Sequence, residues 1–381
     1  MRFRWLAPSV LALFVILFLA AAQPAARAQI VSPNLPAGTP ADQDLQAIAK
    51  ETDAARQKTM YADFVAKYAA DPMATAYGYS QLAQLAFAAG DARQAMEFGD
   101  KSLAAEANNL DMLVSQVQFA QNLKLADKIV EYAARGGKVV QGIGTQPKPA
   151  GMSDEQFAGD NDQQRRSSQQ AYDFLQAAAF SAITTEADPD KRWAEVSQFD
   201  AAFPKSQFSE QTAQLAMYAL QQKGDYAQLA QYGGRVADAN PQSLPILGLL
   251  AGMLAEDPKR GYDTAALSYA RKAADIAAGM DLESDSAKKL AAGMAHAAIG
   301  WVYMKQEKTS SAIGEFSVAA KLVEENPAAY STVLYRLGYA YAKQKDYASA
   351  RATLNKGAAV KGPYQGESKK LLTKVNSIAP R

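Results

Sequence analysis

A unit of two short helical segments recurs along this sequence every 36 to 38 residues, and this period constrains the fold more than any other feature. The most regular copy runs from Leu334 to Ala358, where two stretches with apolar residues at helical spacing flank one turn. Prolines end such units, with steps of 37 residues from Pro204 to Pro241 and of 36 residues from Pro327 to Pro363. Because a single helix pair cannot bury its own apolar face, neighbouring pairs must stack, which predicts a helical solenoid.

The strongest family signal lies within that copy. Leu337-Gly338 is followed by Tyr341 in the first helical segment, and Ala350 is followed four residues later by Leu354 in the second. This arrangement resembles the tetratricopeptide repeat, which carries L-G-x2-Y and A-x3-F elements within about 34 residues. The resemblance implies an all-α fold, a right-handed α-α superhelix of antiparallel helix pairs, and a scaffold that binds other proteins.

Prolines, glycines and polar runs divide the chain into six predicted segments. The clearest interruption is a run of glycine and proline near the middle, and a loop of that length in a repeat array is commonly functional or a linker. The segments are a signal peptide (1–28), a disordered tether (29–42), N-terminal helical repeats (43–135), a long loop with one short helix (136–168), C-terminal repeats (169–365), and a capping helix with the tail (366–381).

The first residues have the pattern of a secretory signal. Arg2 and Arg4 precede an apolar run that is strongest over Val10–Ala22, and Ala26-Arg27-Ala28 fits a small-x-small cleavage site. The alternative is an uncleaved membrane anchor. The sequence contains no cysteine, so it predicts neither disulfides nor a lipid attached at cysteine. We therefore expect a periplasmic or secreted bacterial protein.

The residue types that usually carry catalysis or bind metals do not form a recognisable pattern here. The one histidine, His296, lies in an apolar helical stretch and is expected to pack rather than to act as a base. Segments 160–162 and 281–285 lack the glycine and distal glutamate of a calcium loop, and 142–144 lacks the third glycine of a nucleotide-binding turn. We predict that the protein is not an enzyme and holds no cofactor or metal.

The resemblance implies a binding surface on the concave face, which the first helix of each pair lines in tetratricopeptide arrays. Aromatic rings beside lysines suit an extended peptide or a helix, because rings offer contact area with little entropy to lose. The alternative is that several of these rings belong to the core. The asparagine that clamps a terminal carboxylate in some family members is replaced by Trp301 and Tyr339. The predicted surface residues are Tyr218, Gln222, Trp301, Met304, Lys305, Tyr335, Tyr339 and Lys343.

The leading functional prediction is a non-catalytic scaffold that binds a protein or peptide in the bacterial envelope. A formal net charge of +1 with 21% charged residues indicates neither nucleic acid nor an anionic membrane as the partner. Two alternatives stay open. In one, the array is a self-associating structural spacer. In the other, residues 136–168 fold over the groove and supply acids such as Asp154 or Glu155 to an enzyme acting on a cell-wall polymer.

Overall fold

The computed structural model describes residues 35–145, 147–148 and 150–378. The predicted signal peptide and residues 29–34 of the predicted tether lie outside these ranges. The described residues belong to two compact units, residues 35–219 and residues 220–378.

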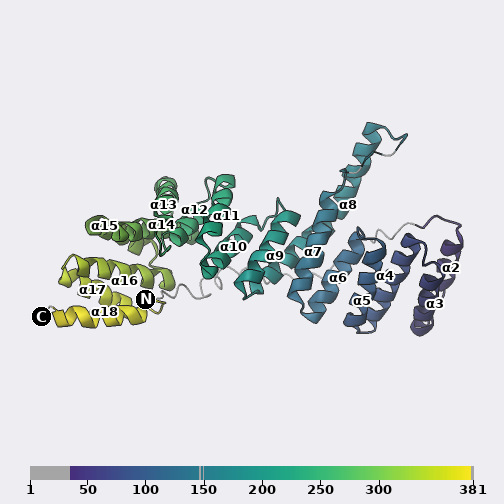
Figure 1. Cartoon of the computed structure of the whole chain (residues 1–381), viewed down its shortest axis with the longest axis horizontal. Helices are drawn as coiled ribbons and strands as arrows, with labels where there is room; N and C mark the ends of the chain where they lie inside the picture. The colour runs from purple at the N-terminus through teal and green to yellow at the C-terminus, as the bar shows by residue number, and fades with distance from the viewer. Residues whose placement is uncertain (1–34, 146, 149, 379–381) are drawn as a thin grey trace. The chain divides into compact units, whose positions relative to one another are not determined.

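Every regular element in the described part of the chain is an α-helix. Within each of the two units consecutive helices pack against one another in sequence order, from α2 to α9 in the first and from α11 to α18 in the second (Figure 1). The first unit contains α2 (Pro40–Ile48), α3 (Ala54–Lys67), α4 (Pro72–Ala88), α5 (Ala92–Ala105), α6 (Leu110–Leu123), α7 (Ala126–Gln141), α8 (Asp154–Thr185), α9 (Pro189–Ala202) and most of α10 (Ser209–Lys223). The second contains the end of α10, α11 (Tyr226–Ala239), α12 (Leu244–Leu254), α13 (Asp263–Ala278), α14 (Ser286–Lys305), α15 (Thr309–Leu322), α16 (Pro327–Lys343), α17 (Tyr347–Ala359) and α18 (Gln365–Ile378). The predicted fold class, all-α with stacked helix pairs, is confirmed.

The helix starts follow local chemical rules that the sequence carries. The Asn326 side chain accepts a hydrogen bond from the backbone N–H of Ala329 at 3.0 Å, and Asp346 accepts one from the N–H of Ser349 at 3.1 Å. These caps satisfy donors that the first turn of a helix leaves unpaired. Pro327, which has no N–H to lose, is the first residue of α16. This proline therefore starts α16 and also marks the end of the preceding helix pair.

Glycines allow the two helices of a pair to approach closely in the second unit. A Cβ atom on Gly338 would lie 2.6 Å from Cδ2 of Leu354, so α16 and α17 meet at this point. A Cβ atom on Gly300 would lie 2.8 Å from the ring of Phe316, where α14 meets α15. A side chain at either position would force the partner residue to move.

The middle of the chain, predicted as a long loop over 136–168, is mostly helical. Helix α7 continues through Gly136 and Gly137 to Gln141. These glycines do not end the helix, because they are points of close packing: a Cβ atom on Gly136 would lie 2.4 Å from Cδ1 of Leu175. The prediction that this stretch is a loop was wrong because it treated contact glycines as helix breakers.

The short helix predicted after Ser153 is the start of α8, which is 32 residues long. Ser153 Oγ accepts a hydrogen bond from the N–H of Gln156 at 3.1 Å, and Gln156 Oε1 accepts one from the N–H of Ser153 at 3.2 Å. This reciprocal pair is a capping box, which starts a helix firmly. Only residues 142–153 connect α7 to α8. The boundary between the two compact units falls instead within α10.

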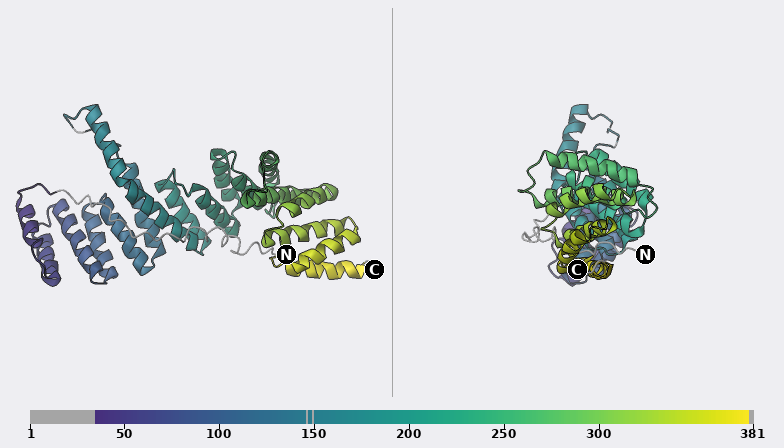
Figure 2. Two further views of the ribbon diagram at one scale, coloured as in Figure 1. Left: turned by 180° about the vertical axis from the view of Figure 1, so that it is seen from behind. Right: turned by 90° about the vertical axis from the view of Figure 1, so that its left-hand side faces the viewer.

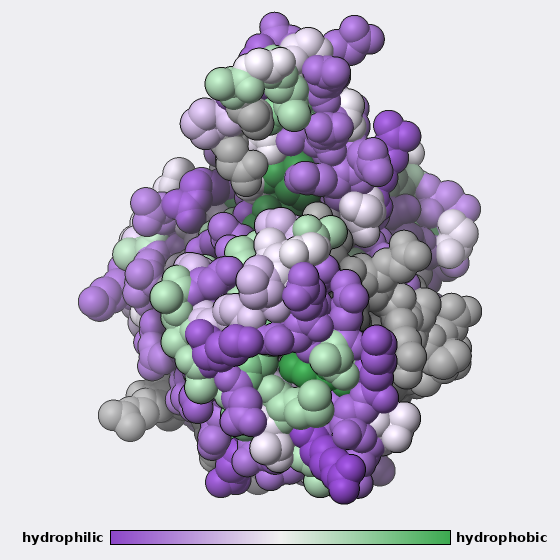
Figure 3. Space-filling view, turned by 90° about the vertical axis from the view of Figure 1, so that its right-hand side faces the viewer, coloured by the Kyte–Doolittle hydropathy of each residue, from purple (hydrophilic) through white to green (hydrophobic). Residues whose placement is uncertain are grey.

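The first half of α8 projects beyond its neighbours in the first unit (Figures 1 and 2). We call residues 154–170 the arm. Its side chains are polar and nearly all exposed, and Figure 3 shows the projecting end as mainly hydrophilic with a small apolar group. Arg165 Nη2 donates to the carbonyl oxygen of Ile143 at 2.7 Å, and Lys148 pairs with Asp154. The connecting segment 142–153 therefore supports the arm.

The two ends of the described chain are closed by helices. Helix α2 begins at Pro40, so its first three residues lie inside the predicted tether, and Thr39 Oγ1 caps it by accepting a hydrogen bond from the N–H of Asp42 at 3.2 Å. Helix α18 lies where a capping helix was predicted, and it packs on α17 through Val375. No helix within the described ranges combines the length and the apolar character needed to cross a membrane.

Candidate binding surface

The predicted binding residues of the second unit lie on the first helices of successive pairs. Helices α12, α14 and α16 contact one another in order, and we call them the first-helix layer. Helices α13, α15 and α17 each pack on the first helix of their own pair. Trp301, Met304 and Lys305 belong to α14, and Tyr335 and Lys343 lie on α16 together with Tyr339.

Helix α16 presents three predicted residues on one side, because positions 335, 339 and 343 are four residues apart. Tyr339 is 40% exposed, which places it among the few large hydrophobic side chains on the described surface. Lys343 is exposed as well. Tyr335 is half-buried, and its ring stacks on that of Tyr364, with centroids 4.9 Å apart and an interplanar angle of 21°. The ring of Tyr335 is therefore held in place by the ring of Tyr364.

The electrostatic environment keeps these phenols neutral. Burial raises the pKa of Tyr335 and of Tyr364, and the positive charge of Arg336 partly opposes the rise. Both hydroxyl groups thus stay protonated at neutral pH. Tyr335 therefore contributes an uncharged, half-buried ring to the α16 face, and the buried ring of Tyr364 supports it.

A buried ion pair connects α16 to the turn after α12. Arg336 Nη2 lies 2.7 Å from Oε1 of Glu256, and the two side chains are 6% and 8% exposed. The Arg336 guanidinium lies over the ring of Trp301, 4.6 Å from its centroid. An arginine on an aromatic face gains a cation–π attraction that strengthens when water is excluded. Trp301 therefore serves as a platform for Arg336, and three consecutive helix pairs are joined through it.

A second ion pair lies in the same layer. Lys305 Nζ donates to the carbonyl oxygen of Ala255 at 2.7 Å and pairs with the carboxylate of Asp263. Arg260 Nε lies 3.1 Å from the other oxygen of Asp263. Lys305 is thus engaged inside the layer, and its side chain is only 14% exposed. It tethers the turn after α12 to α14.

The structure divides the eight predicted residues by their surroundings. Met304 is 5% exposed and belongs to a core cluster with Phe316, so it does not face solvent as the prediction required. Tyr218 is half-buried and belongs to the first unit, whereas Gln222 is exposed at the end of α10 in the second. The residues that α16 brings together on one accessible face are Tyr335, Tyr339 and Lys343.

Sequence reasoning missed the polar partners Glu256, Asp263, Arg336 and Tyr364. The available signal was the enlarged turn at 257–261, which is longer than a repeat turn needs to be. Asp257, the first residue of this turn, is buried, and its carboxylate accepts hydrogen bonds from the N–H groups of Lys259 at 3.0 Å and Gly261 at 2.6 Å. A turn with a buried carboxylate at its centre indicates a fixed structure rather than a spacer.

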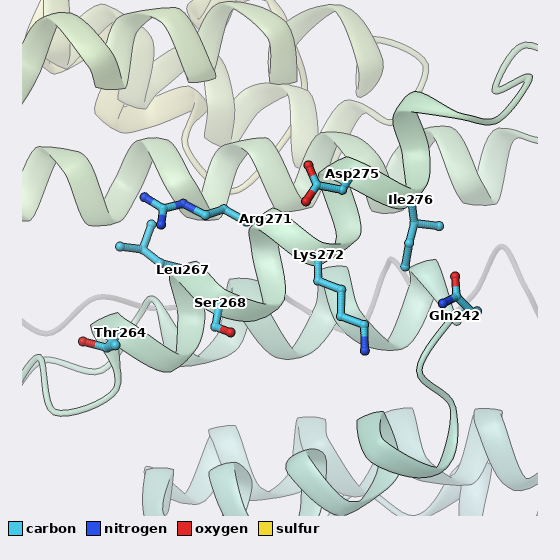
Figure 4. A pocket seen from close by; sticks show the side chains of 8 residues that line it. All are labelled: Gln242, Thr264, Leu267, Ser268, Arg271, Lys272, Asp275 and Ile276. Atoms are coloured by element: carbon cyan, nitrogen blue, oxygen red, sulfur yellow. The ribbon is translucent and has the colours of Figure 1, made fainter.

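A shallow hollow of about 660 Å³ lies along α13 (Figure 4). One of its lining residues, Arg271, donates from Nη2 to the hydroxyl of Tyr303 at 3.3 Å. The hollow contains charges of both signs and no nucleophile paired with a base. Its lining residues are Gln242, Thr264, Leu267, Ser268, Arg271, Lys272, Asp275 and Ile276.

The remaining chemical groups form no metal or catalytic cluster in the part of the chain that the structure describes. No three His, Asp or Glu side chains in the described ranges are grouped to hold an ion. His296 is partly buried, and its Nδ1 lies 2.7 Å from Oε2 of Glu315. This pair links α14 to α15, which agrees with a packed histidine.

Comparison with known protein families finds no family model that matches this chain, and comparison with curated proteins finds no match. Similar solved structures include the TPR domain of P58(IPK), at 14% identity over 89% of this chain and 98% of that one, with a TM-score of 0.28. The APC/C hetero-tetramer Cut9-Hcn1 is 13% identical over 92% of both chains (TM-score 0.27). Apo RapI is 15% identical over 74% of this chain and 76% of that one (TM-score 0.29).

Similarity at these scores supports no conclusion about function. The helix pairs themselves define the class: this is a helical-repeat protein, built from antiparallel pairs that stack in sequence order. The helix pair that Leu337, Gly338, Ala350 and Leu354 predicted is formed by α16 and α17, where a Cβ atom on Gly338 would lie 2.6 Å from Leu354.

Proposed function

We propose that the protein is a non-catalytic scaffold that binds a peptide or protein segment on the accessible face of α16. The observation that carries the proposal is the 40% exposure of Tyr339, although its neighbours Leu337 and Ala340 are buried. A large aromatic ring exposed on a well-packed helix is the kind of side chain that anchors a partner. Lys343, one turn further along, adds a cation at the edge of this surface.

The layer beneath Tyr339 supports this role because it is fixed before a partner arrives. Tyr335 is stacked on Tyr364, and Arg336 is held between Glu256 and Trp301. A surface that needs no reordering loses little conformational entropy on binding, which raises affinity for a given contact area.

The proposal includes the location of the protein, which is the bacterial envelope. The basic start, apolar run and small-x-small site at the N-terminus support export to the bacterial envelope, where the scaffold would assemble other proteins. An enzymatic role for Asp154 or Glu155 has no such support. Both carboxylates project from the arm, with the Asp154 side chain 95% exposed, whereas a general acid or base works within reach of a bound substrate.

The proposal can be tested by capture with a matched control. Wild type, Tyr339→Ala and Val318→Ala would be immobilised, incubated with envelope extract, and the bound proteins quantified by mass spectrometry. Val318 is the control because it is 42% exposed in the same unit but lies on α15. We expect Tyr339→Ala to lose specific partners that Val318→Ala retains. Equal retention by both variants would refute a binding role for the α16 face.

A further inference from the structure

Charge is distributed very unevenly along this nearly neutral chain. Residues 327–378 hold nine lysines and arginines against two acidic residues, a net charge of +7. Residues 35–219 hold sixteen basic and twenty-four acidic residues, a net charge of −8. The overall charge of +1 hides this separation, which is strong enough to direct association between oppositely charged surfaces.

The positive charge is on the surface of the last helices, α16 to α18, which we call the basic end. Its lysines are exposed, and none forms an ion pair with a carboxylate within the described ranges. Helix α18 packs on α16 and α17, and no further helix among the described residues covers its outer side. The exposed lysines are Lys343, Lys345, Lys356, Lys361, Lys369, Lys370 and Lys374.

Exposed negative charge also lies on the arm of the first unit. The arm contains four acidic residues and two arginines. Asp154 pairs with Lys148 and Asp162 pairs with Arg165, so the acidic side chains without an ion pair among the described residues are Glu155 and Asp160. Glu155 and Asp160 are exposed there, and the arm has no helix packed along its outer half (Figure 1). The connecting segment supports one side of the arm through Arg165 and the buried Asn161, and Glu155 and Asp160 stay exposed to a partner.

We propose that the basic end of one molecule docks on the projecting arm of a second copy of this chain. The exposed lysines of the basic end and the exposed carboxylates Glu155 and Asp160 of the arm have opposite charge, and neither group forms an ion pair among the described residues. They also lie in different units, so the contact is head-to-tail, and successive copies can add in the same way. Lys343 belongs to both surfaces, but the other lysines of the basic end lie outside the α16 face around Tyr339, so self-association would bring several such faces into one assembly.

An association of this kind has a recognisable dependence on salt. Exposed charges attract over about 30 Å at an ionic strength of about 0.01 M and over only about 3 Å at about 1 M. Sedimentation velocity of the full chain should therefore show concentration-dependent oligomers at low salt and a monomer at high salt. The encounter rate should fall steeply over the same range.

Charge reversal tests which surfaces meet. One variant carries Lys369→Glu, Lys370→Glu and Lys374→Glu on the basic end, and the other carries Glu155→Lys and Asp160→Lys on the arm. Each alone should weaken self-association by at least about tenfold, and an equimolar mixture of the two should restore it. The matched control carries Asp63→Lys and Glu97→Lys, which change the net charge equally at exposed sites elsewhere in the same unit.

Three results would overturn the proposal. The first is a wild-type protein that remains monomeric at low salt, including one that instead binds vesicles of anionic lipid. The second is a control variant that weakens association as much as the arm variant does. The third is a mixture that fails to restore association while circular dichroism shows both variants to be folded.

Discussion

Two buried glutamates, Glu256 in the second unit and Glu195 in the first, differ in whether the carboxylate has a cationic partner. Glu256 lies 2.7 Å from Arg336, which in turn rests on Trp301. Glu195, on α9, is 6% exposed, and its Oε2 atom has no hydrogen-bond partner among the described residues. A buried carboxylate with a matched cation can remain charged, whereas one without a matched cation favours its protonated form.

The electrostatic consequence is large for Glu195. Burial raises its pKa to about 7, with Glu186 and Asp127 adding to the rise and Lys191 and Arg192 opposing it. The first unit therefore contains a buried carboxyl group that titrates near neutral pH, whereas the buried Glu256 of the second unit has a guanidinium 2.7 Å away. The Arg336–Glu256 ion pair stabilises the second unit, whereas the titration of Glu195 makes the stability of the first unit depend on pH.

The largest effect is expected from removing the cation beside Glu256. Arg336→Leu should lower the free energy of unfolding by about 3 to 5 kcal/mol, because the carboxylate loses its guanidinium while it stays buried. Urea denaturation followed by circular dichroism measures the change. Lys343→Leu, on the same helix but exposed, is the control and should change stability by less than about 0.5 kcal/mol. Similar losses in both variants would show that the buried pair has no special role.

The next effect is the pH dependence that Glu195 confers. Its folded pKa of about 7 lies above the unfolded value of 4.5, so the stabilising contribution is complete below about pH 4.5 and is lost as pH rises through 7. The loss amounts to about 3 kcal/mol. Glu195→Gln should remove this component from stability measured between pH 5 and pH 8, whereas Glu97→Gln, at an exposed site, should not. A pH profile that Glu195→Gln leaves unchanged would contradict the assignment.

A smaller effect separates packing from charge on α16. Gly338→Leu should destabilise by about 1 to 3 kcal/mol, because the new side chain meets Leu354 where even a Cβ atom would be 2.6 Å away. Gly314→Leu is the control, since no atom lies within 4 Å of a Cβ at that helical glycine. Thermal melting of both variants measures the difference. Unchanged melting of Gly338→Leu would mean that α16 and α17 do not meet there.

The smallest effect on stability is expected at the residue most important for binding. Tyr339→Ala should change the free energy of unfolding by less than about 0.5 kcal/mol, because the ring is exposed and, among the described residues, makes no stacking contact like that of Tyr335. Thermal melting of purified protein checks this. A large loss of stability would assign Tyr339 to the core and would weaken the binding proposal.

The sequence predicted the contacts between the two helices of one pair, and it missed the contacts between different helix pairs. Gly338 and Leu354 are close in sequence, and their spacing indicates a helix pair. Arg336 and Glu256 are 80 residues apart, and no period relates them. Their pairing depends on how α12, α14 and α16 stack, which local spacing does not specify.

Glycine caused the other error, the prediction of a loop over 136–168, because glycine occurs both in turns and at close helix contacts. In the turn at Gly224, φ is +70° and glycine relieves backbone strain. At Gly136 and Gly137 the backbone is helical and glycine makes room for Leu175 and Phe203. Composition alone treats both as breaks, so a helix was predicted as a loop. The binding residues were predicted from the resemblance, and exposure separates Tyr339 and Lys343 from the buried Met304.

The most direct test of the central claim, that a partner binds on the α16 face, is photo-crosslinking from a single position in the intact cell envelope. A photoreactive phenylalanine analogue at position 339 should crosslink to a specific partner, and the same analogue at position 318, equally exposed on α15, should not. Crosslinks from 339 that are absent from 318 are the predicted result. Identical crosslinks from both positions, or none from 339 in folded protein, would contradict the account.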